Sequence, residues 1–172
     1  ISKSPIRTMP AKLINEIIAS FSTKYEINVV LDNSEISASI EKNININDLK
    51  KLKPDSLESL IKIVQQTEFG IFVDSGPLHL AKIFGIDGVL IITTVSDKIL
   101  LNNFKTIHPI KNFFTSAYCA APCGLTNLFN YNNLIGCYES LKIKKENILN
   151  IDNLNSMQRG QIKNTYTDFI NK

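Results

Sequence analysis

The 172-residue sequence has no apolar stretch that approaches the roughly 18 residues needed to cross a membrane. Its N-terminus shows no charged region followed by an apolar core and a cleavage site, so no secretory signal is visible. The net charge of +3 is small and dispersed, which argues against a nucleic-acid partner. Internal repeats and low-complexity linkers are absent as well. These absences leave an ordinary α/β domain as the expected class.

Cysteine and histidine are scarce, which limits the possible metal sites. The sequence has three cysteines, Cys119, Cys123 and Cys137, and the one other candidate ligand is His108. A pair of cysteines four residues apart with one distant cysteine is a poor zinc signature. An odd number of cysteines in a cytosolic protein favours reduced thiols packed in a loop, with a metal site as the alternative. We therefore predict no metal and no cofactor.

The composition and the length favour one domain that spans residues 1–172. Hydrophobic residues make up 44% of the chain and charged residues 20%, and domains commonly have about 100–150 residues. Helical and strand patterns alternate, which predicts a parallel sheet covered by helices on both faces. The expected helices are residues 10–21, 57–64, 77–84, 99–103 and 153–171. The expected strands are residues 27–31, 44–46, 69–73 and 89–92, with an edge segment at 106–110 and a long loop at 112–133.

The most informative motif is Asp-Ser-Gly-Pro-Leu-His at residues 74–79, between the buried run 69–73 and a helical pattern. A turn from the carboxyl end of a strand into a helix is the usual ligand position in open α/β sheets. The free N–H groups and the dipole of the first helical turn favour a phosphate there. Ser75 could add a hydroxyl donor, and Gly76 lets the backbone approach a ligand. The alternative is that Asp74 or Ser75 only caps the helix and that Gly76 only turns the chain.

The order of motifs along residues 5–150 resembles that of glycosyltransferase family 9, the lipopolysaccharide heptosyltransferases. Residues 74–80 are similar to the family's Asp-(Ser/Thr)-Gly-x-x-His-Leu, and the helix start Asp-Ser-Leu-Glu at residues 55–58 is similar to its Ser-Leu-Glu. Upstream, Arg7-Thr8-Met9-Pro10 is similar to the family's Lys-x-Trp-Pro. Val29-Val30-Leu31 followed by Glu35 is similar to its strand-loop-glutamate element. Downstream, Cys119, Cys123 and Cys137 are similar to its cysteine-bearing tail.

The resemblance implies a Rossmann-like three-layer domain with a parallel sheet, the C-terminal, donor-binding half of a GT-B fold. It implies an inverting transfer from a nucleotide sugar, ADP-heptose-like, in lipopolysaccharide or surface-glycan synthesis. The catalytic base would lie in an N-terminal acceptor half that this sequence does not contain. No catalytic residue is therefore assigned here, and we expect residues 1–172 alone to be inactive.

The resemblance also implies the donor-binding residues. Arg7 would hold the diphosphate, Glu35 the ribose hydroxyls, and Asp74 the sugar or its own loop. The full predicted set is Arg7, Glu35, Asp55, Asp74, Ser75, Gly76 and His79. The nucleotide sugar is a substrate, and a glycan or lipid-linked acceptor would bind through the missing half. We expect a cytoplasmic location that extends to peripheral association with the inner face of the cell membrane.

Departures from the family pattern keep two other functions open. Arg7 stands where the family has lysine, Met9 where it has tryptophan, and residues 92–97 where it has Phe-Gly-Pro-Thr and an acidic residue. These changes would permit a catalytically silent binding or interaction module. The second alternative is a domain of a sugar-nucleotide epimerase-like protein, because such proteins also use Asp-Ser-Gly. Such epimerases have glutamates soon after the glycine, whereas this chain has Leu78, His79 and Leu80.

Overall fold

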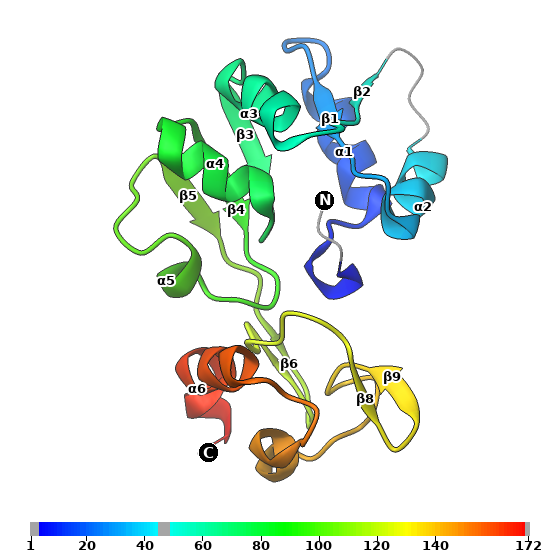
Figure 1. Cartoon of the computed structure of the whole chain (residues 1–172), viewed down its shortest axis with the longest axis vertical. Coiled ribbons are helices and arrows are strands. Elements are labelled where there is room, and N and C mark those ends of the chain that lie inside the picture. The colour runs from blue at the N-terminus through cyan, green and yellow to red at the C-terminus, as the bar shows by residue number, and fades with distance from the viewer. Residues whose placement is uncertain (1–3, 45–48, 171–172) are drawn as a thin grey trace.

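The computed structural model describes residues 4–44 and 49–170 of the chain (Figure 1). The helices are α1 (Ala11–Phe21), α2 (Glu35–Asn43), α3 (Leu57–Gln65), α4 (Gly76–Phe84), α5 (Asp97–Leu100) and α6 (Ser156–Ile170), with 3₁₀ turns η1 (Pro5–Arg7) and η2 (Lys145–Asn150). The strands are β1 (Asn28–Val30), β2 (Lys50–Leu52), β3 (Phe69–Phe72), β4 (Asp87–Ile91), β5 (Ile107–Ile110), β6 (Phe114–Thr115), β7 (Ala120–Ala121), β8 (Phe129–Tyr131) and β9 (Leu134–Gly136).

The α/β part contains two parallel sheets where the sequence predicts one. Strands β1 and β2 form the first sheet, and β3, β4 and β5 form the second in that order. The mixed α/β class with parallel strands is confirmed. The single sheet is not observed, because β1 and β3 are not hydrogen-bonded to each other. Strand β5 ends the second sheet, which suits its Pro109, since proline is tolerated on edge strands.

Local sequence signals explain where α3 and α4 begin and end. Ser56 and Ser59 form a reciprocal capping box at the start of α3. Pro77 occupies the first turn of α4, where its missing N–H costs nothing. Gly85 ends α4 with a φ of 68°, a left-handed conformation that glycine adopts without a steric penalty. The predicted termination of this helix at Gly85 is confirmed.

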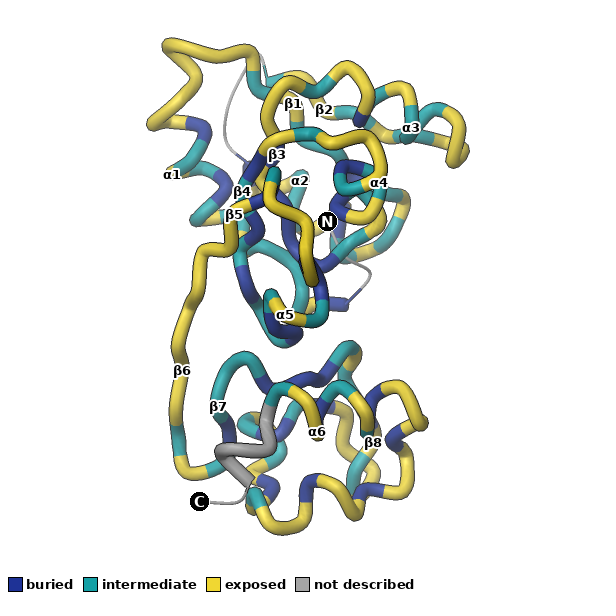
Figure 2. The backbone as a smooth tube through the Cα atoms, turned by 90° about the vertical axis from the view of Figure 1, so that its left-hand side faces the viewer, coloured by how far each residue is buried: buried dark blue, intermediate teal, exposed yellow. Residues whose placement is uncertain are grey.

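Buried positions are dark blue in Figure 2, and the buried hydrophobic residues form three separate clusters. The first cluster joins α1 to the β1–β2 sheet around Ile14 and Ile18. The second lies between α4 and the β3–β4–β5 sheet, with Leu78 and Leu90 fully buried. The third holds the C-terminal part of the chain together. Its buried members are Cys119, Cys123, Leu125, Phe129, Tyr138, Ile143, Ile148, Ile151, Leu154 and Ile162.

Two further sequence predictions differ from the structure, and one lies mostly outside the described residues. Helix α2 was missed, although Ser34 caps it through the N–H of Ser37. The segment 112–133 is not one long loop, because β6, β7 and β8 all lie within it. The turn between β8 and β9 contains Asn132 and Asn133, both with positive φ, a combination that favours tight hairpins. Of the strand expected at 44–46, residues 45 and 46 lie outside the described ranges.

No helix within residues 4–44 and 49–170 combines the length and the apolar character that crossing a bilayer requires.

Candidate anion site at the start of α4

The candidate site lies where β3 leads into α4, as the sequence predicts. Asp74 follows β3 and is buried, with 9% of its side chain exposed. Arg7 comes from η1, and its Nη1 donates to Asp74 Oδ2 at 2.9 Å. The structure therefore brings together two residues that lie 67 positions apart in the sequence.

Short local contacts hold Arg7 in place. The Arg7 N–H donates to the Ser4 carbonyl at 3.0 Å, and the Thr8 hydroxyl donates to the same carbonyl at 2.9 Å. Ile6 packs against the C-terminal cluster, and Met9 packs against the cluster around α1. The side chain of Arg7 is 20% exposed. Its Nε is buried and has no hydrogen-bond partner within the described ranges.

Ser75 does not make the capping hydrogen bond that the sequence suggests as one of its two roles. It occupies the N-cap position of α4, but its side chain makes no capping hydrogen bond. Its hydroxyl instead donates to the Val73 carbonyl at 3.0 Å. Gly76 lies in open space, because no heavy atom beyond its chain neighbours and its own helix backbone lies within 4 Å of where a Cβ would stand. The backbone at the start of α4 can therefore be approached closely by a ligand.

The other predicted site residues are not joined to this pair. Glu35 is the first residue of α2 and is exposed. Asp55 is exposed beside α3, where its carboxylate accepts from the Ser59 hydroxyl at 3.0 Å, and this bond lowers the pKa of Asp55. His79 is exposed in α4. Among the predicted residues, only Arg7 and Asp74 are linked by a hydrogen bond or ion pair in the described structure.

Two threonines that the sequence analysis did not select belong to the same edge of the sheet. Phe72 of β3 pairs with Leu90 of β4. Ser75 and Thr93 each come three residues after this pair, so they leave the sheet at the same edge. The hydroxyl oxygens of Thr93 and Thr94 are buried and have no hydrogen-bond partner among residues 4–44 and 49–170. The signal available in the sequence was a pair of hydroxyl residues directly after a strand.

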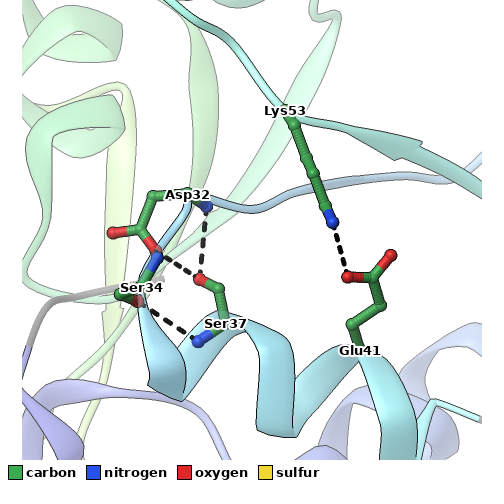
Figure 3. A network of polar contacts seen from close by, with 5 residues as sticks. All are labelled: Asp32, Ser34, Ser37, Glu41 and Lys53. Carbon is green, nitrogen blue, oxygen red and sulfur yellow. Dashed lines mark hydrogen bonds and ion pairs between the residues drawn. The ribbon is translucent and has the colours of Figure 1, made fainter.

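A second polar cluster connects the end of β1 to the start of α2 (Figure 3). The carboxylate of Asp32 accepts from the Ser34 N–H at 3.0 Å and from the hydroxyls of Ser34 and Ser37. Ser37 is fully buried. Partial burial raises the pKa of Asp32, but the hydrogen bonds from Ser34 and Ser37 outweigh it, so the pKa is lower than usual. The cluster is internally satisfied, which indicates a cap for α2.

We expect Asp32→Ala to lower the free energy of unfolding by about 1–2 kcal/mol at pH 7, because it removes hydrogen bonds to a carboxylate. A carboxyl whose folded pKa is lowered stabilises the fold above its unfolded pKa, and this contribution disappears as the pH falls through the folded pKa. The difference in urea midpoint between wild type and variant should therefore shrink from pH 7 to about pH 3.

Glu41→Gln is the matched control for this prediction, since Glu41 on α2 bonds Lys53 at 2.6 Å in a more exposed setting (Figure 3). It should change the midpoint less than Asp32→Ala at pH 7. Equal effects would contradict the capping role of Asp32.

The cysteines form no disulfide among the described residues and pack in the C-terminal cluster. Cys119 and Cys123 are buried, and Cys137 is half-buried. A hydrogen bond from Cys119 lowers the pKa of Cys123. Within the part of the chain that the structure describes, no group of three or more histidine, cysteine, aspartate or glutamate side chains is arranged to hold a metal ion.

No protein-family model matches this chain, and neither the curated proteins nor the solved structures include a match.

Proposed function

We propose that this chain is the nucleotide-sugar-binding domain of an inverting glycosyltransferase similar to the lipopolysaccharide heptosyltransferases, the C-terminal half of a GT-B fold. The main observation behind the proposal is the hydrogen bond from Arg7 to Asp74, which places a guanidinium at the β3–α4 turn. The proposed donor is a nucleotide sugar of the ADP-heptose type, and the acceptor is a glycan or lipid-linked sugar bound by another domain. The proposed location is the cytoplasm, including the inner face of the membrane.

The charges at the start of α4 support a diphosphate ligand. The helix N-terminus contributes partial positive charge and free N–H groups, and Gly76 leaves room for a close approach. Arg7 adds a fixed cation whose Nε–H has no partner within the described ranges. Guanidinium groups bind phosphate oxygens in pairs. A diphosphate at this position could satisfy Arg7 Nε and the hydroxyls of Thr93 and Thr94 together.

The same groups suit the chemistry of sugar transfer. When an acceptor hydroxyl attacks the anomeric carbon, the bond to the diphosphate breaks and negative charge grows on the leaving phosphate oxygen. Arg7 and the α4 N-terminus would stabilise that charge in fixed positions, which lowers the barrier without reorganisation. The catalytic base would come from the acceptor domain. Asp74 would hold Arg7 and the loop in place.

Two contacts favour a catalytically silent binding module as the second candidate. One Arg7 nitrogen is already bound to Asp74, and the Ser75 hydroxyl donates to its own loop. Both groups are therefore partly occupied without a ligand. Binding experiments separate the two functions.

Titration with ADP, GDP and UDP should show weak binding, with a Kd of ~0.1–1 mM for a half-open site. NMR shifts should be concentrated at Arg7 and at residues 74–79, 93 and 94. Asp74→Asn should retain binding because the asparagine side-chain oxygen can still accept from Arg7, whereas Arg7→Lys should weaken it several-fold because the paired donors are lost. Lys12→Met, at an exposed position of α1, is the control and should change nothing. Absence of shifts at residues 74–79 at ~10 mM nucleotide, about ten times the weakest expected Kd, would favour the silent module.

A further inference from the structure

The two parallel sheets present unpaired edges toward each other. In the first sheet β1 pairs only with β2, and in the second β3 pairs only with β4, within residues 4–44 and 49–170. Figure 1 shows β1 and β3 on facing sides of the two sheets, both running from the top of the view downward. Unpaired strand edges expose rows of N–H and C=O groups that bind another strand readily.

Backbone directions identify which amides face this position. The Leu31 N–H donates to the Leu52 carbonyl of the β2 side at 2.9 Å, so the N–H of Val30, one residue earlier, points away from β2. On β4, the N–H groups of Gly88 and Ile92 donate to carbonyls on the β5 side. N–H directions alternate along a strand, so the N–H of Val89 points toward β3. Ile71 is level with Val89, and in a parallel pair it therefore points its N–H away from β4.

The strand order indicates what is missing between β1 and β3. From one edge to the other the observed strands run β2, β1, then β3, β4, β5. One strand between β1 and β3 that comes first along the chain would give the order 3-2-1-4-5-6 of doubly wound sheets. The described residues before β1 form η1 and α1 and contain no strand. Such a strand would therefore precede η1.

We propose that one further parallel β-strand, from polypeptide on the N-terminal side of Ile1, fills the position between β1 and β3 and joins the two sheets into one. Its neighbours are apolar: Phe69 and Ile71 are exposed, and Val29 and Val30 are half-buried. A near-continuous apolar run suits such a central strand. This inference rests on the sheet edges and is independent of the proposed function.

The carboxyl end of this strand would lie beside the candidate anion site. Arg7 ties η1 to Asp74 at the carboxyl end of β3, so a short connection suffices between the strand and Ser4. The loop after the strand then forms the second side of the crevice opposite α4. This is the switch point between the two halves of a doubly wound sheet, where ligands bind.

Amide hydrogen exchange tests the proposal in residues 1–172 and in the same protein extended by the residues encoded upstream of Ile1. In residues 1–172, the amides of Val30 and Ile71 should exchange fast, whereas Leu31 and Phe72, which face β2 and β4, should be protected. In the longer protein, Val30 and Ile71 should exchange about 100-fold more slowly, and the two controls should change little. Equal exchange in both proteins would overturn the proposal, as would a gene with no coding sequence upstream of Ile1. Protection of Val30 and Ile71 in residues 1–172 that grows with protein concentration would also overturn it, because a second copy would then occupy the position.

Discussion

Replacing Arg7 with methionine is expected to lower the free energy of unfolding by about 3 kcal/mol, because it leaves the Asp74 carboxylate buried without its cation. Asp74 has 9% of its side chain exposed, so water cannot readily replace the guanidinium. Urea denaturation followed by circular dichroism measures the loss. The double variant Arg7→Met with Asp74→Asn should be less destabilised than the sum of the single variants, since no unpaired charge remains buried.

The exposed ion pair between Lys62 and Glu58 on α3 provides the control for this experiment. Their nitrogen and oxygen are 2.8 Å apart, but the side chains are 67% and 78% exposed. Lys62→Met should therefore change stability by no more than about 0.5 kcal/mol. A loss at Arg7 as small as the loss at Lys62 would show that the Arg7–Asp74 contact is solvated.

Replacing Gly124 with alanine is expected to destabilise the fold by about 3 kcal/mol or more. Gly124 has a φ of 79°, and an added Cβ would lie 2.6 Å from the backbone nitrogen of Ile162 in α6. The left-handed strain and the overlap with a helix backbone each cost about 1–3 kcal/mol. Thermal unfolding of the variant measures the combined effect.

Gly160→Ala in the same helix α6 serves as the matched control. A Cβ at Gly160 meets nothing within 4 Å, and its φ is not left-handed. Alanine stabilises a helix interior by about 1 kcal/mol relative to glycine, so this variant should be slightly more stable than wild type. Destabilisation by both substitutions would contradict the packing of α6 against Gly124.

The sequence predicted the helices and strands that have strong periodicity and clear end signals. Helix α4, which Gly85 ends, and the strand before it combine an apolar run, a proline in the first turn and a terminal glycine. Helix α2 was missed because its start, Asp32-Asn33-Ser34, is also a turn signal and its polar residues obscure the spacing of Ile36 and Ile40. The hairpins after β5 were missed because strands of two or three residues show no alternation that can be read.

The candidate site was predicted in its position but not in its contacts. The strand-to-helix turn follows from local pattern, so Asp74 and Gly76 could be placed without a structure. The bond between Arg7 and Asp74 depends on tertiary packing across 67 residues, and local spacing carries no information about it. The Ser75 hydroxyl has several acceptors within reach, and only the loop geometry selects the Val73 carbonyl. The burial of the Thr93 and Thr94 hydroxyls likewise requires the folded loop.

The segment around η1 packs against two of the hydrophobic clusters and is bonded at the end of β3. Ile6 packs on the C-terminal cluster, Met9 packs on the α1 cluster, and Arg7 is bonded at the end of β3, beside the second cluster. Four consecutive positions, residues 6–9, thus connect parts of the fold that lie far apart along the sequence. Cutting the chain after Met9 would let the clusters unfold at separate temperatures. A ligand that draws Arg7 away from Asp74 would change how cooperatively the molecule unfolds.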